Sequence, residues 1–479
     1  MPKRMPNILW ICTDQQRFDT IHALGNPRIR TPNLDRLVSE GVAFLNAYSQ
    51  SPICTPSRAS FLTGYYPSSL HVNRNGAAYF PPAMAERLIT RKLAKIGYDC
   101  GLAGKLHLSA ADRRVELRPD DGYRVFRWSH HPYPEPFWPT DQHDYQRWLR
   151  DQGVDWESAY GAKKLEGWDG GELYSPGIEA RYHQTTWCAD EAIAFMTEPR
   201  QGPWLMSVNP FDPHPPFDPP PEYLERMDVA SMPMPLFDPK EMESQLAFRG
   251  IDHQTEEPRS PYDYDARRMI AAYYAQIELI DDQVGRMLDA LEASGQRENT
   301  IVIFTSDHGE MLGDHGLLFK GCRFYEGAVH VPLIISWPGH FQEGLRSEAL
   351  VELVDIVPTL LEVVGLPVPG DMHGRSLLPI LTGQVHPHHH RDFVLSEYHD
   401  ALARPYASHG NMIFDGRYKL CIYHGREIGE LYDLQEDPHE FHNLWYEPDM
   451  LPVKLDLMKR CFDTWMLAID LGPPRVARF

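Results

Sequence analysis

The 479-residue sequence has no hydrophobic run long enough to cross a membrane as a helix. Its first apolar run, Ile8–Cys12, is too short for the core of a signal peptide, and no small-residue cleavage site follows it. These absences predict a protein that does not associate with membranes and that resides in the cytoplasm.

Cysteine and positive charge are also scarce. The 7 cysteines are scattered without a C-x-x-C pair, which argues against a disulfide framework or a zinc knuckle and fits a reducing compartment. Lys and Arg number 46 against 67 Asp and Glu, giving a formal charge of -21. A field of this sign repels nucleic acid, so we expect no nucleic-acid partner, and an anionic substrate must find a local positive pocket.

Two apolar runs end directly in polar side chains. Residues 7–14 read NILWICTD and residues 299–310 read NTIVIFTSDHGE, which predicts two buried strands that deliver Asp14 and Asp307 to the carboxyl edge of a sheet. Between them, residues 33–44, 84–98 and 273–294 carry helical patterns. Alternating strands and helices predict an α/β fold with a doubly wound, mixed or parallel sheet.

The rest of the chain predicts a second, smaller unit. Residues 118–265 are rich in Pro, aromatic and acidic residues, so we expect long ordered loops that cover a site. After Gly383 come a linker-like HPHHH run, to which we assign no role, and short strand patterns with a hairpin signal at Asp415-Gly416. We therefore predict a catalytic α/β domain over 1–384 and a small α+β domain with an antiparallel sheet over 385–479. Nothing in the sequence excludes a homo-oligomer.

The segment around Cys54 carries the most chemistry. Pro56 suits the first turn of a helix, which would set Cys54 at the positive N-terminal end, and Arg58 one turn later can point back to the same place. Taken singly, Cys54 could be a small buried residue and Arg58 a surface salt-bridge partner.

The stretch SPICTPSRASFLTGYYP resembles the sulfatase signature C-x-P-S-R-x-x-x-L-T-G. In that family the cysteine is converted to formylglycine, whose hydrated aldehyde supplies the attacking oxygen. The resemblance therefore implies that Cys54 is the precursor of the nucleophile and that a formylglycine-generating enzyme is needed for maturation.

The resemblance also implies a site for one divalent cation, with ligands Asp14, Gln15, Asp307, His308 and the oxygen of modified residue 54. Oxygen donors with one imidazole suit Ca²⁺, Mg²⁺ or Mn²⁺, and family resemblance favours Ca²⁺. Many sulfatases have a second aspartate where this chain has Gln15, and the lost charge makes Mn²⁺ credible. The alternative for Asp14 and Gln15 is a helix cap or turn.

Other motif positions match the family. In GKLH, Lys105 and His107 are alternate residues that face the same side of an extended segment. The resemblance implies that Lys105 and Lys320 contact the sulfate oxygens. It also implies that His107 transfers a proton and that His214 protonates the leaving group. Asn75 is a weaker match for substrate binding, and solvated or structural roles are the alternative for each. We interpret Glu310 and His315 as loop or cap residues.

The resemblance runs from the first strand to the terminal ELYDLQEDPHEFHNL. It implies an alkaline-phosphatase-like fold and an enzyme that hydrolyses a small-molecule aryl or alkyl sulfate monoester. A phosphonate monoester or phosphodiester hydrolase of the same superfamily is the nearest alternative, which Gln15 leaves open and which GKLH disfavours.

Three further alternatives fit less well. The sequence lacks the glycine-rich phosphate-binding loop of a cysteine phosphatase. A phosphoglycerate-mutase-like isomerase would need two metals and a Ser or Thr nucleophile. A non-catalytic binding protein would not require all these charged groups together.

Overall fold

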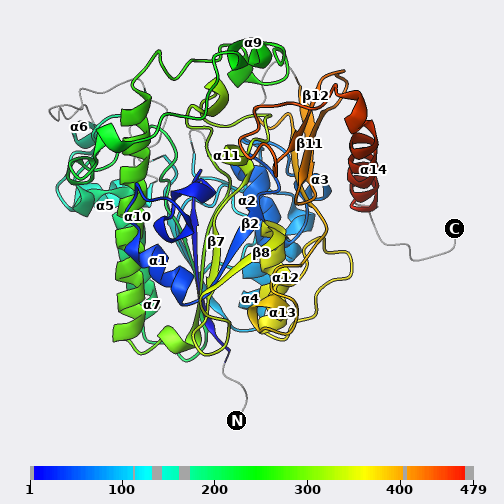
Figure 1. The fold of residues 1–479 in the computed structure, drawn as a ribbon. Helices are drawn as coiled ribbons and strands as arrows, with labels where there is room; N and C mark the ends of the chain where they lie inside the picture. Colours follow the sequence, from blue (N-terminus) through cyan, green and yellow to red (C-terminus); the bar gives the residue numbers. More distant parts are fainter. Residues whose placement is uncertain (1–4, 112–113, 132–142, 161–172, 403–406, 470–479) are drawn as a thin grey trace, which may run out of the picture.

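The computed structural model describes residues 5–111, 114–131, 143–160, 173–402 and 407–469. Its centre is an eight-stranded sheet with the order β4-β3-β5-β1-β6-β7-β2-β8 (Figure 1). The strands are β1 Asn7–Thr13, β2 Val42–Tyr48, β3 Asp99–Gly104, β4 Val125–Trp128, β5 Trp204–Asn209, β6 Thr300–Ser306, β7 Leu333–Ser336 and β8 Leu345–Glu352.

The two predicted strands are β1 and β6, and they are adjacent and parallel. All seven residues of each are buried, and they pair in register from Asn7 with Thr300 to Thr13 with Ser306. Strand β7 runs antiparallel to both of its neighbours in this sheet. The sheet is therefore mixed, as predicted, and the chain leaves β1 and β6 at the same carboxyl edge.

Helices cover both faces of the sheet. One face packs against α1 Pro32–Ser39, α7 Gln184–Thr197 and α10 Ala266–Ala293, and the other against α2 Cys54–Thr63, α4 Ile89–Lys95 and α12 Ile356–Val363 (Figure 1). Other α-helices in this part of the chain are α3 Pro67–Leu70, α5 Asp144–Asp151, α6 Trp156–Tyr160, α8 Pro221–Leu224, α9 Glu241–Leu246, α11 Glu326–Val329 and α13 Leu378–Leu381.

Two local predictions were wrong. The helical pattern over 33–44 is a helix only to Ser39, and β2 begins at Val42. Glycine disfavours a helix interior, and Gly41 instead lies against β7, where a Cβ would be 2.6 Å from the carbonyl oxygen of Ile335. Residues 118–265 were expected to be loops, yet they contain α7 and β5, a strand near the centre of the sheet. The proline-rich surroundings obscured the short apolar run of β5.

A second sheet follows, as predicted. Its antiparallel strands are β9 Val394–His399, β10 His409–Phe414, β11 Tyr418–Tyr423 and β12 Gly429–Asp433, with the hairpin at Asp415-Gly416 and helix α14 Leu451–Leu467 packed on it. Phe414 and Tyr423 of this sheet share a buried cluster with Tyr48 and Phe324 of the main unit. The boundary after residue 384 remains a prediction.

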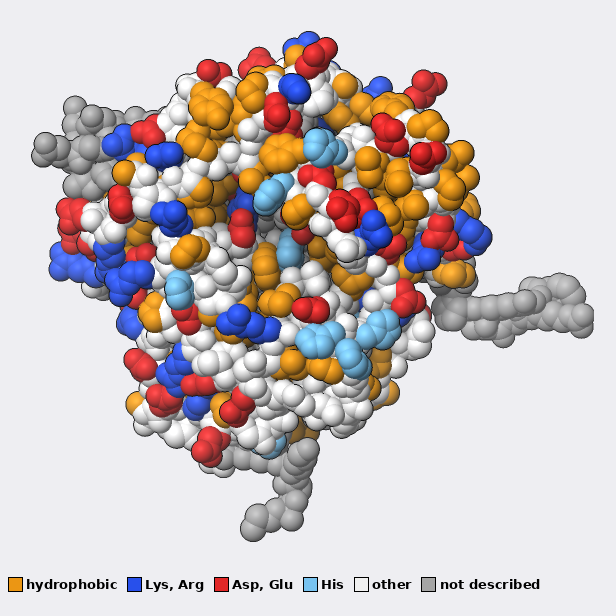
Figure 2. Space-filling model, viewed as in Figure 1, with side chains coloured by type: hydrophobic (Ala, Val, Ile, Leu, Met, Phe, Trp, Pro, Cys, Tyr) orange, Lys and Arg blue, Asp and Glu red, His pale blue; other side chains and the backbone are white. Residues whose placement is uncertain are grey.

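None of the helices in the described ranges is both long and apolar enough to span a membrane. On the face shown in Figure 2, acidic and basic side chains are interspersed rather than gathered into one basic area.

Candidate active site

The carboxyl edge of the main sheet gathers four buried side chains that could bind a metal. Asp14 follows β1, Asp307 and His308 follow β6, and Cys54 begins α2. The ligand atoms of these residues all lie within 4.8 Å of one another. The parallel pairing of β1 with β6 explains this convergence, because it brings both strand ends to one place.

Helix α2 begins at Cys54, with Pro56 in its first turn, as predicted. The Sγ of Cys54 lies 3.2 Å from Nε2 of His308, whose Nδ1 donates to the carbonyl of Gly309 at 2.9 Å. Asn75 uses its Oδ1 to accept the Thr55 N–H at 3.0 Å. The amide oxygen of Asn75 thus caps the helix that carries Cys54, and its contact with substrate remains a prediction.

The ammonium of Lys320 lies among the predicted cation ligands. Its Nζ is 2.7 Å from Gln15 Oε1 and 3.0 Å from Cys54 Sγ. It is also 3.2 Å from His308 Nε2 and 4.0 Å from Asp14 Oδ1. Electron-pair donor atoms of these four residues therefore surround one positive charge. The same atoms could bind a divalent cation of the Ca²⁺, Mg²⁺ or Mn²⁺ type. Residue 54 takes part in this cluster through its Sγ.

Arg58 braces the two aspartates from inside the protein. Its Nε donates to Asp307 Oδ2 at 2.8 Å, and its Nη2 lies 3.4 Å from Asp14 Oδ2. A third donor, Nη1, binds the carbonyl of Lys105 at 2.9 Å. Arg58 is fully buried. It therefore fixes the carboxylates and the GKLH segment together.

Positive charge controls the ionisation of this cluster. Lys105 Nζ contacts Asp14 Oδ2, and although burial raises the pKa of Asp14, Lys105, His214 and Lys320 lower it well below its ordinary value. Burial and Asp14 raise the pKa of the Cys54 thiol, but Lys105, Lys320 and His308 outweigh them and lower it to about 5. The site therefore stabilises negative charge at position 54.

His107 is held by a carboxylate that the sequence did not single out. Glu116 accepts the backbone N–H groups of His107 and Leu108, both at 2.8 Å, and the Nε1–H of Trp128 at 2.9 Å. His107 has φ 56°, and its ring packs edge-on against His130 with centroids 4.5 Å apart. Burial, then Lys105, lowers the pKa of His107 well below its ordinary value, so this imidazole is neutral.

His214 lies on the loop after β5 and interacts electrostatically with Asp14 and Lys320. Its Nδ1 lies 2.7 Å from the carbonyl oxygen of Pro215 and its ring packs on Phe211 with centroids 4.4 Å apart. Burial, then Lys320, lowers the pKa of His214 well below its ordinary value. The predicted acid therefore borders the cluster.

A second buried group, His183, Asp212 and Asp218, anchors this loop. Asp212 accepts Thr185 Oγ1 at 2.6 Å and Gln276 Nε2 at 3.2 Å, and the same amide lies 3.5 Å from Asp218. These contacts hold the two ends of the 212–218 segment around His214.

Two side chains interpreted as loop or cap residues have defined contacts. Glu310 lies on a loop, as interpreted, but it is fully buried and also binds Gln15. No motif or periodicity links Glu310 to Gln15, which lies 295 residues away. His315 stacks on Tyr325 with centroids 4.0 Å apart and contacts Glu241, away from the cation ligands.

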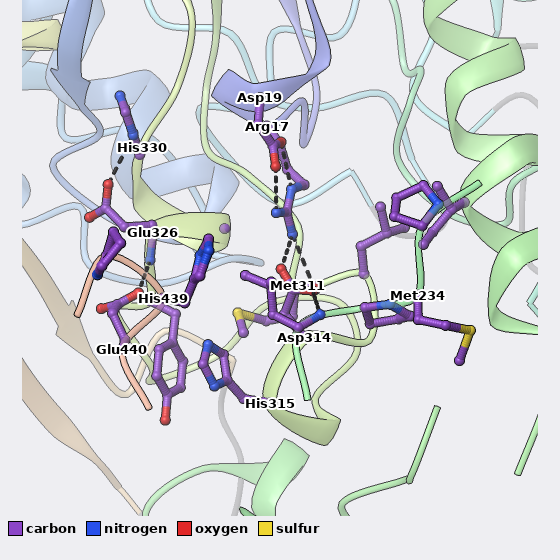
Figure 3. Close-up of a pocket in the computed structure, with 18 of the residues that line it drawn as sticks. Arg17, Asp19, Met234, Met311, Asp314, His315, Glu326, His330, His439 and Glu440 are labelled. Atoms are coloured by element: carbon purple, nitrogen blue, oxygen red, sulfur yellow. Dashed lines mark hydrogen bonds and ion pairs between the residues drawn. The ribbon is translucent and has the colours of Figure 1, made fainter. Parts of the chain in front are cut away.

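A cavity of about 350 Å³ lies beside the site, but none of the predicted site residues line it (Figure 3). Several of its charges are paired: Arg17 lies between Asp19 and Asp314, 2.7 Å from each, and His330 binds Glu326 at 2.9 Å. Arg17 also donates to the carbonyl of Glu310 at 3.1 Å. Arg17 thus holds the outer side of the loop that bears Glu310.

Comparison with known proteins assigns the chain to a family. Residues 6–366 match the Sulfatase family, and residues 313–465 match the N-sulphoglucosamine sulphohydrolase C-terminal family. An arylsulfatase of Clostridium perfringens is 31% identical over 92% of this chain and 90% of its own. The multifunctional alkaline phosphatase superfamily protein PehA of Trinickia caryophylli is 30% identical over 96% of this chain and 95% of its own.

A solved structure agrees over the whole length. The phosphonate monoester hydrolase SpPMH from Silicibacter pomeroyi superposes with a TM-score of 0.83 at 26% identity, covering 99% of this chain and 98% of that one. The chain is therefore an enzyme of the sulfatase family, within the alkaline phosphatase superfamily, and it has the alkaline-phosphatase-like fold of that family.

Proposed function

We propose that this enzyme hydrolyses a small-molecule sulfate monoester, using formylglycine at position 54 and one divalent cation. One observation carries the proposal: residue 54 begins a helix at the point where Asp14, Asp307 and His308 converge with Lys320. The helix N-terminus and the surrounding positive charges stabilise an anion at position 54. That is the electrostatic environment that an ionised nucleophilic oxygen and a sulfate group both require.

The cation would be held by Asp14, Gln15, Asp307, His308 and residue 54, and when bound it would lower the pKa of the nucleophile's hydroxyl. Formylglycine, once formed from Cys54, would supply that hydroxyl as its hydrated aldehyde. A formylglycine-generating enzyme would be the partner for this maturation. The chain's own residues have the remaining tasks of binding and proton transfer.

Lys105 and Lys320 flank position 54 and would neutralise the oxygens of the sulfate group. Arg58 cannot reach out to substrate, because its donors are occupied by Asp307, Asp14 and the Lys105 carbonyl. Its task is to keep the two carboxylates in place. The sequence predicted that Arg58 points back to the start of the helix, and it does so by binding the two aspartates there.

The two histidines divide the proton transfers. His214 would protonate the leaving oxygen. Burial and Lys320 leave its imidazole neutral in the free site, and the negative charge of a bound sulfate ester would raise its pKa and favour the protonated form. His107, neutral and buried, would act as the base at residue 54 in the later step that releases sulfate.

A phosphonate monoester hydrolase is the second candidate, supported by the full-length superposition on SpPMH and by Gln15. The GKLH segment favours the sulfate ester, because Lys105 and His107 match the sulfatase pattern. The test is to compare kcat/KM on an aryl sulfate with that on a phenyl phosphonate ester, using enzyme of known formylglycine content and Cys54→Ala as the blank. A higher kcat/KM on the phosphonate ester would reverse the assignment.

A further inference from the structure

Every polar group of Gln15 has a partner. Its N–H donates to Asp307 Oδ1 at 3.0 Å, and its carbonyl accepts the Tyr273 hydroxyl at 2.7 Å. In the side chain, Nε2 donates to Glu310 and Oε1 accepts Lys320 Nζ at 2.7 Å. The backbone of Gln15 has φ 72°. The four hydrogen bonds fix both its main chain and its side chain.

Glu310 accepts three N–H groups in the protein interior. Its Oε2 takes the amide of Gln15, and its Oε1 takes the backbone N–H groups of Leu312 at 2.9 Å and Phe319 at 2.5 Å. The residue has no exposed surface. A buried carboxylate is costly unless hydrogen-bonded, so its retention here requires these donors.

The carboxylate decides which end of the Gln15 amide faces the cluster. An ionised carboxylate only accepts hydrogen bonds, so it must face the NH₂ end of the amide. The amide oxygen then faces Lys320, whose Nζ also contacts Cys54 and His308. The opposite orientation would place an oxygen against the carboxylate and an NH₂ group against the ammonium.

We infer that Glu310 is a positioning residue that orients the Gln15 amide oxygen into the cation site. The inference rests on the proposed function, since it concerns a ligand of the cation proposed there. It also explains why a glutamine at position 15 needs a partner that fixes its orientation. An aspartate or glutamate presents two equivalent oxygens, whereas an amide has one end that binds a cation and one that does not.

Glu310 positions the other side of the site as well. Leu312 and Phe319 both have positive φ, 51° and 65°, and their N–H groups converge on one oxygen of Glu310. Lys320 follows Phe319 directly. One carboxylate therefore fixes both the Gln15 amide and the end of the loop that carries Lys320.

The test is titration of metal-free, full-length enzyme with Mn²⁺ by calorimetry. In Glu310→Gln, the new amide oxygen accepts the Leu312 and Phe319 N–H groups, and its NH₂ group faces that of Gln15, which favours a flipped Gln15. We expect the Mn²⁺ affinity to fall about tenfold or more, as when groups that hold metal ligands are lost. The matched control Glu241→Gln also changes a buried carboxylate, which contacts His315, and should leave Mn²⁺ affinity unchanged.

The exchanged pair Gln15→Glu with Glu310→Gln is the sharper variant. The new amide at position 310 then donates to the new carboxylate at position 15, whose other oxygen faces the cation, so Mn²⁺ affinity should return to the wild-type value or exceed it. Gln15→Glu alone opposes two buried carboxylates. If Glu310→Gln does not fold alone, the inference still predicts that adding it to Gln15→Glu tightens Mn²⁺ binding, whereas a merely structural Glu310 predicts a further loss.

The outcomes separate the two proposals. If the wild type binds neither Mn²⁺ nor Ca²⁺, the proposed function fails and the inference with it. If the wild type binds Mn²⁺ and Glu310→Gln binds it equally well, or the exchanged pair shows no recovery, the inference alone is overturned.

Discussion

Lys320 Nζ lies 3.0 Å from Cys54 Sγ, although 266 residues separate the two in sequence. Both residues are buried, so water screens their interaction only weakly. The pair shows how strongly this site stabilises negative charge at position 54, before any modification of the cysteine.

The first prediction concerns unmodified Cys54, whose thiol pKa is lowered to about 5. Because the pKa lies below 7, the thiolate predominates at neutral pH and is lost only as the pH falls through about 5. Ultraviolet difference absorbance between unmodified enzyme and Cys54→Ser, recorded across pH, measures this step. Lys320→Met should raise the midpoint, and a midpoint near the ordinary thiol value of 9.0 in the unsubstituted chain would contradict the prediction.

The second prediction is that active enzyme contains formylglycine. The tryptic peptide of residues 37–58 should appear in mass spectra as an aldehyde lighter than the cysteine form, and activity should scale with its fraction. Cys54→Ala should abolish turnover without unfolding the chain. Cys54→Ser should become trapped after one turnover, because it lacks the second hydroxyl. Full activity with entirely unmodified cysteine would refute the mechanism.

Third, the enzyme should bind one divalent cation per chain, and chelation should remove activity that the returned ion restores. Elemental analysis identifies the ion. Asp307→Asn should bind it weakly, since Asp307 is also the anchor of Arg58 and of the Gln15 N–H. Two stoichiometric zinc ions, or full turnover by metal-free enzyme, would favour a different branch of the superfamily.

Fourth, His214→Ala should slow sulfate esters with poor leaving groups by about 10²–10⁴-fold. Nitrophenyl sulfates, whose leaving group needs little protonation, should slow by less than about tenfold. Rates across a series of phenyl sulfates give the dependence on leaving-group pKa. An equal loss across the series would assign His214 to binding instead.

The fifth prediction uses Gly104, the residue before Lys105. It has φ +106°, and a Cβ there would lie 1.9 Å from the carbonyl oxygen of Asn209. Gly104→Ala should lower the free energy of unfolding by about 3 kcal/mol and displace Lys105 from Asp14. Gly97→Ala, at φ +95° with open space around it, should cost only ~1 kcal/mol in thermal unfolding. Similar losses in the two variants would show that the overlap is relieved elsewhere.

The sequence predicted the parts of the site that lie at strand and helix ends. Apolar runs that stop at Asp14 and Asp307 mark the carboxyl edge of a sheet, and Pro56 marks the start of the helix that holds Cys54. Family resemblance supplied Lys105, His107, His214 and Lys320.

The contact of Glu116 with the His107 segment and that of Glu310 with Gln15 escaped prediction for a physical reason. Each glutamate is a buried carboxylate whose partners are mainly backbone N–H groups, and a backbone donor leaves no trace in residue type. Strand β5 was missed because its neighbours in sequence are turn formers, while its neighbours in space are β1 and β3. Such features depend on long-range contacts that local patterns do not encode.

Cys54 is only 1% exposed, and His308 and Lys320, which lie against its sulfur, are made more than 250 residues later in the chain. An enzyme that must bind the segment around Cys54 would therefore have to act before the later part of the chain folds against that segment. The proposed oxidation thus belongs to biosynthesis. The fraction of active molecules would then depend on the rate of folding relative to the rate of modification. A chain that folds unmodified would stay inactive until it unfolds.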